Sequence, residues 1–142
     1  MPRMIFVNLP VADLPRSMAF YDALGFVNEP KFTDETAAAM QWSDTIVVML
    51  LTHAKWHQFT DRPITSDGSS SLRLCLSLDT RDEVTEMNRL AGEHGGTADI
   101  DPPTEYPFMM SHAFADPDGH IWEPMWMDQA AMEAGPPAQT DA

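Results

Sequence analysis

The segment DPDGHIWEPMW, residues 116–126, decides how this chain of 142 residues is expected to fold. Its first residues favour a tight turn, because proline sets φ to about −65° and glycine permits a positive φ. The residues after the turn are apolar or aromatic, which is typical of a strand, and Glu123 is the exception. A carboxylate on such a strand is costly to bury unless a cation or hydrogen bonds satisfy it. The segment therefore predicts a hairpin that carries a candidate functional carboxylate, the alternative being a Glu123 that faces water.

Composition narrows the classes of partner. The chain has 8 basic and 22 acidic residues, a formal net charge of −14, which disfavours nucleic acid and anionic membrane surfaces. No apolar run approaches the roughly 20 residues of a membrane span, and the N-terminus does not resemble a signal peptide. The single cysteine, Cys75, cannot form an internal disulfide. These features predict a cytoplasmic protein without nucleic-acid or membrane partners.

The N-terminal half has the pattern of one helix among four strands. Alternating apolar residues predict a first strand at residues 4–9, and Asp13 has the chemistry of an N-cap for a helix that runs to about Leu24. Strand patterns follow from Phe26, at residues 37–42 and at residues 45–51. The predicted order is βαβββ.

The same order returns after a polar linker at residues 53–71, which has a short helix predicted within it. Leucines alternate with polar residues from Leu72 to Leu78, and either Asp79 or Thr80 can cap the helix that follows. The remaining predicted strands cover residues 97–100, 108–115 and 120–127, and a frayed tail is expected from residue 128.

Three motifs carry a family resemblance: NLPVADL at residues 8–14, FYDALGF at residues 20–26 and DPDGHIWE at residues 116–123. They resemble the vicinal oxygen chelate superfamily, which includes glyoxalase I, extradiol dioxygenases, fosfomycin-resistance enzymes and bleomycin-binding proteins. Within it, the chain looks most like glyoxalase-like proteins labelled predicted lactoylglutathione lyase. The resemblance implies an α+β fold of two tandem βαβββ modules with a cleft between curved mixed sheets. The expected division of a single domain, residues 1–142, is module one at 4–52, a linker at 53–71, module two at 72–127 and a tail at 128–142.

The resemblance also implies where a metal would bind. Metal-dependent members have ligands on the first, fourth, fifth and eighth strands, and these positions hold Phe6, Met49, Arg73 and Glu123 here. Only Glu123 suits a divalent ion, and the fixed cation of Arg73 would repel one. We therefore expect neither a metal nor another cofactor, with a divalent metal as the alternative.

The same positions favour a binding pocket. Phe6 and Met49 would give apolar walls, Arg73 could bind an anion, and Asn8 could form hydrogen bonds. Cys75 shares the face of Arg73 and is either an activated thiolate or an inert thiol. Aromatic residues of the strands, Trp42, Trp122 and Trp126, could add flat surface, although a core position is their usual one. The expected ligand-binding residues are Phe6, Asn8, Met49, Arg73, Cys75, Trp122 and Glu123.

Arg73 and Glu123 are expected to lie within reach of each other or of one shared ligand. A bidentate guanidinium would satisfy the carboxylate that a metal would otherwise hold. If the pair is buried, removing Arg73 should cost roughly 2–4 kcal/mol.

Three functions remain open. The first is a homodimeric protein that binds a small molecule in the cleft between the two sheets, without the usual metal. The second is a lyase or isomerase resembling glyoxalase I, or a dioxygenase-like enzyme, with replacement ligands such as His112, His120 or the linker histidines around Glu123. In that case Glu123 and His112 are the candidate catalytic residues, because a histidine titrates near neutral pH. The third is a structural or regulatory dimer with a vestigial cleft.

Overall fold

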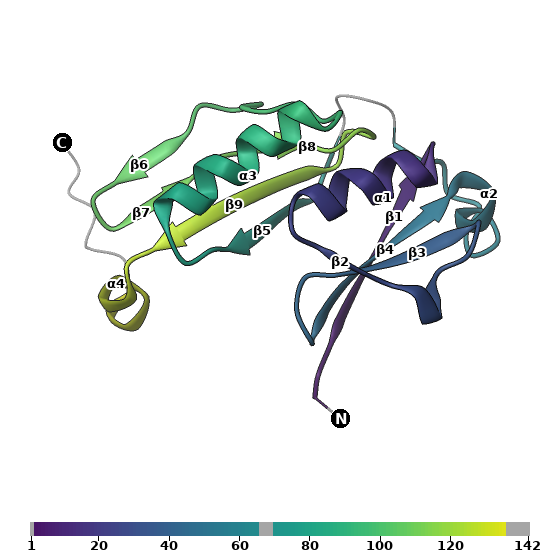
Figure 1. Cartoon of the computed structure of the whole chain (residues 1–142), viewed down its shortest axis with the longest axis horizontal. Coiled ribbons are helices and arrows are strands. Elements are labelled where there is room, and N and C mark those ends of the chain that lie inside the picture. The colour runs from purple at the N-terminus through teal and green to yellow at the C-terminus, as the bar shows by residue number, and fades with distance from the viewer. Residues whose placement is uncertain (1, 66–69, 136–142) are drawn as a thin grey trace.

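The computed structural model describes residues 2–65 and 70–135, which form two mixed sheets lying side by side (Figure 1). The first sheet has the strand order β1-β4-β3-β2 and the second the order β5-β9-β7-β6, with β8 paired to β9. In both sheets the first and last strands are parallel neighbours, β1 with β4 and β5 with β9. The predicted α+β class is confirmed.

The elements of the first half follow the predicted βαβββ order. They are β1 (Ile5–Val11), α1 (Leu14–Ala23), β2 (Val27–Glu29), a 3₁₀ turn η1 (Pro30–Phe32), β3 (Ala37–Gln41) and β4 (Ile46–Thr52), followed by α2 (His53–Trp56). Asp13 caps α1 by accepting a hydrogen bond of 3.1 Å from the backbone N–H of Arg16. Gly25 ends the helical turn at a φ of +105°, which an L side chain rarely adopts.

The second half contains β5 (Arg73–Ser77), α3 (Arg81–Glu93), β6 (Thr104–Tyr106), β7 (Met109–Ser111), β8 (Phe114–Ala115), β9 (Ile121–Met127) and α4 (Gln129–Ala134). Thr80, rather than Asp79, is the N-cap of α3, and its hydroxyl accepts from the backbone N–H of Glu83 at 3.1 Å. Figure 1 shows α1 and α3 on the same side of the two sheets. The opposite faces of both sheets are therefore left open by these helices.

Several predictions for this half were wrong. The expected strand at residues 108–115 is divided into β7 and β8, and β6 was not predicted. Residues 97–100 make only an isolated bridge, Thr97 to Ala115, because Asp99 takes a φ of +51° that interrupts an extended chain. The tail was expected to be frayed, but α4 forms there, since Gln, Ala, Met and Glu are good helix formers. Residues 136–142 of the expected tail lie outside the described part of the chain.

One hydrophobic core lies between the helices and the sheets. Alternate residues of several strands point into it, Leu9 from β1 and Trp122 from β9 among them. The Trp122 ring packs edge-on against Tyr21 and Phe26, with centroids 5.8 and 5.7 Å apart. Each such buried aromatic or aliphatic side chain contributes about 1.5–3 kcal/mol, so this packing holds the two sheets in one body.

The expected hairpin at residues 116–119 is present. The backbone N–H of Gly119 donates to the carbonyl of Asp116 at 3.0 Å, and Gly119 takes a φ of +90°. Asp118 accepts from the backbone N–H of Ala12 at 2.8 Å, so a turn of the second half is bonded to the first.

The side chain of Asp116 forms the buried part of this contact. It accepts from the Tyr21 hydroxyl at 2.5 Å, and Trp122 Nε1 donates to that same hydroxyl at 3.0 Å. Burial raises the pKa of Asp116, while the hydrogen bond from Tyr21 opposes that rise. Turn, helix α1 and strand β9 are therefore joined by one polar network inside the core.

Across residues 2–65 and 70–135, the structure contains no helix that is both long enough and apolar enough to span a membrane.

Candidate functional site

The open face of the first sheet carries an apolar pocket of about 520 Å³. Strand alternation sends Val7 and Leu9 toward the core, so Phe6 and Asn8 face the other way, as the sequence predicts. Phe6 and Met49 line this pocket together with Phe32 of η1. Its lining residues all belong to the first half of the chain.

A second pocket of about 350 Å³ adjoins the first at Asn8 and Met49. The side chains of Lys55, Trp56 and Phe59, in and after α2, line its other side. From the sequence, these residues were expected only to form part of the linker at residues 53–71. The signal that could have revealed them is the pair of aromatic residues within an otherwise polar stretch.

A third pocket, of about 330 Å³, lies where the linker passes between the two sheets. Asn8 and Trp56 line it as well, with Arg62, Leu72 and His120. Asn8 thus contributes to all three pockets, which places its amide where they meet.

Arg73 lies on the open face of the second sheet between two carboxylates. Its Nη2 is 2.7 Å from Asp101 Oδ2, and its Nε donates to Glu123 Oε1. These hydrogen bonds, first that of Asp101 and then that of Glu123, raise the pKa of Arg73. The predicted pairing with Glu123 is confirmed, and Asp101 is a partner that sequence reasoning missed.

The pair is not buried, however. The side chains of Arg73 and Glu123 are 45% and 30% exposed, so solvent screens their attraction. Removing Arg73 was expected to cost roughly 2–4 kcal/mol only if the pair is buried, so this loss is not expected here. A partly exposed pair stabilises the protein by about 0–1 kcal/mol.

Cys75 lies beside this pair without being activated by it. Burial, and to a lesser degree the charge of Glu123, raises the pKa of the Cys75 thiol. The thiol is therefore held in its protonated form, which favours the inert alternative over the thiolate.

The three tryptophans of the strands occupy different positions. Trp122 is 2% exposed and belongs to the core, so its expected place on a cleft wall is corrected. Trp42 is half-buried, and its ring centroid is 5.0 Å from that of Phe26. The Trp126 ring lies under the Arg81 guanidinium, whose Cζ is 4.6 Å from the ring centroid.

The two histidines considered as partners of Glu123 lie elsewhere. The backbone N–H of His112 donates to the carbonyl of Pro124, a residue that faces the core. The Nδ1 of His112 is 3.0 Å from Asp99 Oδ1. Asn88 of α3 also donates to that oxygen, so His112 is on the helix side of the second sheet and Glu123 is on the other side. His120 Nε2 lies 2.8 Å from the carbonyl oxygen of Pro10. The candidate catalytic pair of Glu123 and His112 is not brought together.

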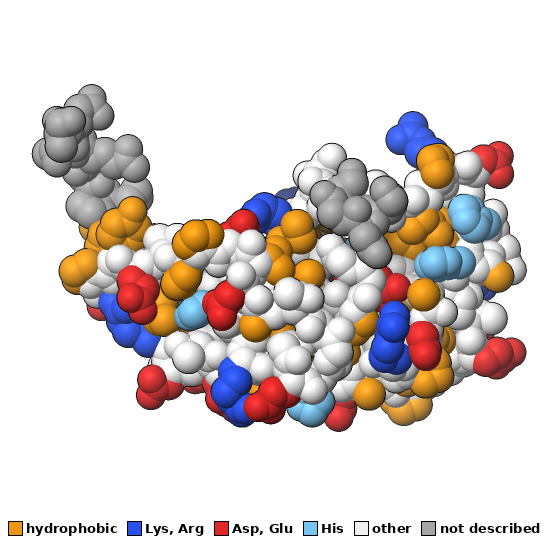
Figure 2. Space-filling model, turned by 90° about the horizontal axis from the view of Figure 1, so that it is seen from above, with side chains coloured by type: hydrophobic (Ala, Val, Ile, Leu, Met, Phe, Trp, Pro, Cys, Tyr) orange, Lys and Arg blue, Asp and Glu red, His pale blue; other side chains and the backbone are white. Residues whose placement is uncertain are grey.

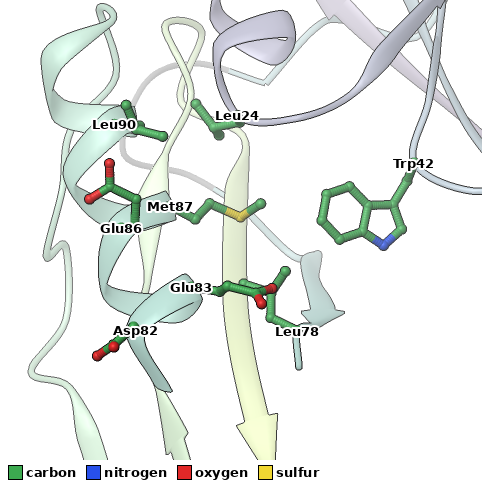
Figure 3. Close-up of a pocket in the computed structure, with 8 residues that line it drawn as sticks. All are labelled: Leu24, Trp42, Leu78, Asp82, Glu83, Glu86, Met87 and Leu90. Atoms are coloured by element: carbon green, nitrogen blue, oxygen red, sulfur yellow. The ribbon is translucent and has the colours of Figure 1, made fainter. Parts of the chain in front are cut away.

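A groove of about 570 Å³ lies on the helix side, between the end of α1 and α3 (Figure 3). Figure 3 shows Met87 and Glu83 pointing from α3 toward Trp42, while Asp82 and Glu86 point away. Leu24 and Met87 of its wall belong to the core. The groove is thus the outer edge of the packing between the two halves.

The metal-ligand positions of the resembling family hold no convergent donor set here. Phe6 and Met49 line the apolar pocket, and the Glu123 carboxylate is bonded to Arg73. In the part of the chain that the structure describes, no group of three His, Cys, Asp or Glu residues could hold a metal ion.

Residues 3–123 match the Glyoxalase/Bleomycin resistance protein/Dioxygenase superfamily. The chain belongs to this superfamily. A comparison with curated proteins found none that matches the chain in sequence.

Several solved structures share the fold. A hypothetical protein from S. aureus is 24% identical, with a TM-score of 0.74 over 89% of this chain and 94% of that one. A glyoxalase-related enzyme from Fulvimarina pelagi is 23% identical, with a TM-score of 0.73 over 89% and 88%. The fosfomycin resistance protein FosX from Mesorhizobium loti is 14% identical, with a TM-score of 0.65 over 94% and 98%. At these identities the likeness extends to the fold alone, since one scaffold hosts different chemistries.

Proposed function

We propose that this glyoxalase-superfamily protein binds a small organic molecule on the open face of its first sheet. The observation that carries the proposal is the apolar pocket of about 520 Å³ that Phe6 and Met49 line, at two positions where metal-dependent relatives have ligands. Its volume is in the range of small-molecule sites, and its lining is mostly apolar with a few polar groups, as such sites are.

The proposed site works without the superfamily's divalent metal. An aromatic ring and a thioether replace two hard donors, and a guanidinium replaces the third. Arg73 already neutralises Glu123, the ligand position that is retained. The residues present therefore do not fit the metal, and no step of the proposal runs through one.

The alternative is a metal-dependent lyase, isomerase or dioxygenase with replacement ligands around Glu123. It would need a replacement ligand such as His112, His120 or a linker histidine near that carboxylate. His112 is bonded to Asp99 on the helix side, and His120 to the carbonyl of Pro10. The binding role is therefore the better supported of the two.

We further propose that two chains associate through their open faces. Phe6, Phe32 and Phe59 are all more than half exposed, which is unusual for large apolar side chains of a monomer. Figure 2, a view from above, shows hydrophobic side chains at the surface, interspersed with charged ones. A partner chain over Phe6, Phe32 and Phe59 would bury these three side chains and close the top of the pocket. Light scattering at micromolar concentration should give the mass of a dimer, and a monomer would contradict it.

Two further expectations concern organisation and location. One core contains residues of both sheets, which supports a single domain, so unfolding should be cooperative by two independent probes. The free thiol of Cys75 is compatible with a reducing, cytoplasmic location, which cell fractionation can test.

The binding proposal is tested with a thermal-shift screen of small aromatic and aliphatic compounds, followed by calorimetric titration of the hits. A compound that binds only the native state raises its apparent stability. Met49→Lys, which introduces a charge into the pocket, should abolish binding. Glu83→Gln, in the groove of Figure 3, is the matched control and should leave binding unchanged.

Metal analysis tests the metal-free part separately. The purified protein, loaded with nickel, zinc or iron and then dialysed, should retain less than stoichiometric metal. Stoichiometric retention that is lost in Glu123→Gln would overturn this part of the proposal.

A further inference from the structure

We propose that the ligand is an organic anion, with its carboxylate at Lys55 and Trp56 and its apolar body along Met49 and Phe6. This inference rests on the proposed binding function and names the chemical class of the ligand.

The shape of the site supplies the first argument. The apolar pocket lined by Phe6 and the pocket under α2 share Asn8 and Met49, so they form one continuous trough. An elongated molecule with an apolar body and a polar head fits a trough whose two ends differ in chemistry.

Trp56 supplies the second argument. Its Nε1 is buried and has no hydrogen-bond partner in residues 2–65 and 70–135, and it is the one such side-chain atom found there. Trp56 lines both the pocket under α2 and the third pocket, beside the linker. A buried donor without an acceptor is destabilising, and an acceptor atom on a ligand would satisfy it.

Lys55 favours a negatively charged head group. This protein carries a net charge of −14, so an anion is bound only where cations are left available locally. Within the described residues, Lys55 makes no ion pair, and its Nζ lies 5.6 Å from the centroid of the Phe59 ring. Arg73 and Arg89, in contrast, are each bonded to two carboxylates.

Asp34 is a carboxylate that interacts with Lys55, but within the described residues the two side chains form no ion pair. The hydrogen bonds from Thr36 and Ala37 lower the pKa of Asp34 more than the charge of Lys55 does, so the two charges interact only weakly. Lys55 is therefore left to attract an anion at this end of the trough.

The opposite end fixes the orientation of the ligand. Glu29 is the charged residue that lines the pocket of Phe6, and it would repel a carboxylate placed there. Asn8, whose amide lies between the two ends, can donate a hydrogen bond to the head group. The head group therefore lies at Lys55 and the apolar body points toward Phe6.

The test uses three probes that share a chain length and differ in charge: octanoate, octanol and octylammonium. Titration calorimetry on the full chain should show octanoate binding at least about tenfold more tightly than octanol, and octylammonium most weakly. Lys55→Met should remove the preference for octanoate over octanol, and Lys55→Arg should retain that preference. In the NMR spectrum, the indole N–H signal that Trp56→Phe removes should move on addition of octanoate.

The outcomes separate this inference from the binding proposal. If octanol or octylammonium binds as tightly as octanoate, and Met49→Lys abolishes that binding, the binding proposal is supported and the inference that the ligand is an anion is wrong. If Lys55→Met binds octanoate as the unchanged protein does, the placement of the head group is wrong. If none of the probes binds, the anion inference fails, and the binding proposal fails with it only when the thermal-shift screen also finds no ligand. If Met49→Lys leaves octanol binding unchanged, the ligand binds elsewhere and both proposals fail. Glu83→Gln again serves as the control, because it changes an acidic residue outside the trough.

Discussion

Removing one oxygen from the core should destabilise the protein strongly. Tyr21 is fully buried, and its hydroxyl donates to Asp116 at 2.5 Å while it accepts from Trp122 Nε1 at 3.0 Å. Tyr21→Phe keeps the ring and deletes both bonds. It also leaves a carboxylate oxygen and an indole N–H buried without these partners.

The magnitude follows from those two groups. A hydrogen bond to a charged group contributes about 1.5–3 kcal/mol, and a buried donor left unsatisfied costs about 1–3 kcal/mol. Because the two terms share one site and are not additive, we expect a total loss of about 3 kcal/mol. At roughly 2–4 °C per kcal/mol for a chain of this size, the Tm should fall by roughly 6–12 °C.

Urea unfolding followed by circular dichroism and by tryptophan fluorescence measures this loss. Tyr106→Phe is the control, because the Tyr106 side chain is 51% exposed and the same atom is removed. The double variant Tyr21→Phe/Asp116→Asn should lose less than the sum of the single variants, since the two groups interact directly. A loss below about 0.5 kcal/mol for Tyr21→Phe, or strict additivity, would refute the proposed contribution of the network.

Further predictions follow from the pH dependence, the ion pair and the turn. Burial raises the folded-state pKa of Asp116 above its ordinary value of 3.8, so its stabilising contribution is present below that pH and is lost as the pH rises through the raised value. As the pH rises from 3.8 through the raised pKa, the free energy of unfolding of the wild type should therefore fall relative to that of Asp116→Asn. A relative rise would contradict the direction of this pKa shift. Arg73→Met should cost at most about 1 kcal/mol in urea unfolding, because the pair is partly exposed, and a larger loss would indicate a pair shielded from solvent. Gly96→Ala should cost about 1–3 kcal/mol by the same assay, since its new Cβ would lie 2.4 Å from a backbone carbonyl, and a neutral result would mean that the segment moves easily. Asp118→Ala should cost about 1–2 kcal/mol through the lost bond to Ala12, whereas Asp118→Asn should recover part of it.

The fold could be predicted because its signals are local. The turn at residues 116–119 needs its proline and glycine, and the leucines of β5 alternate regardless of what packs on them. Asp13 and Thr80 cap helices through bonds to residues three positions away. Each of these signals lies within one short segment, so no tertiary information is required.

The site was less predictable, because it depends on long-range packing. Whether Arg73 is buried depends on what covers its sheet, and the role of Lys55 depends on where α2 lies against β4. His112 points to the side of the sheet on which Asp99 lies, and its ring contacts that carboxylate. No sequence pattern predicted the positive φ of Asp99.

One error could have been avoided from the sequence. Trp122 and Glu123 are adjacent in a strand, and adjacent strand residues point to opposite faces of the sheet. If Glu123 faces the open side, Trp122 has to face the core. Both were nevertheless expected to contact one ligand.

That alternation also separates stability from binding in this protein. On β9, Trp122 joins the buried network of Tyr21 and Asp116, while Glu123 on the opposite face pairs with Arg73 near solvent. A substitution at Glu123 therefore changes the charge of the open face without touching the core bonds, and a substitution at Tyr21 does the reverse. Because the two sets of contacts share a strand but no side chain, a variant of Glu123 that unfolds the protein would show that the open face, too, contributes to holding the sheets together.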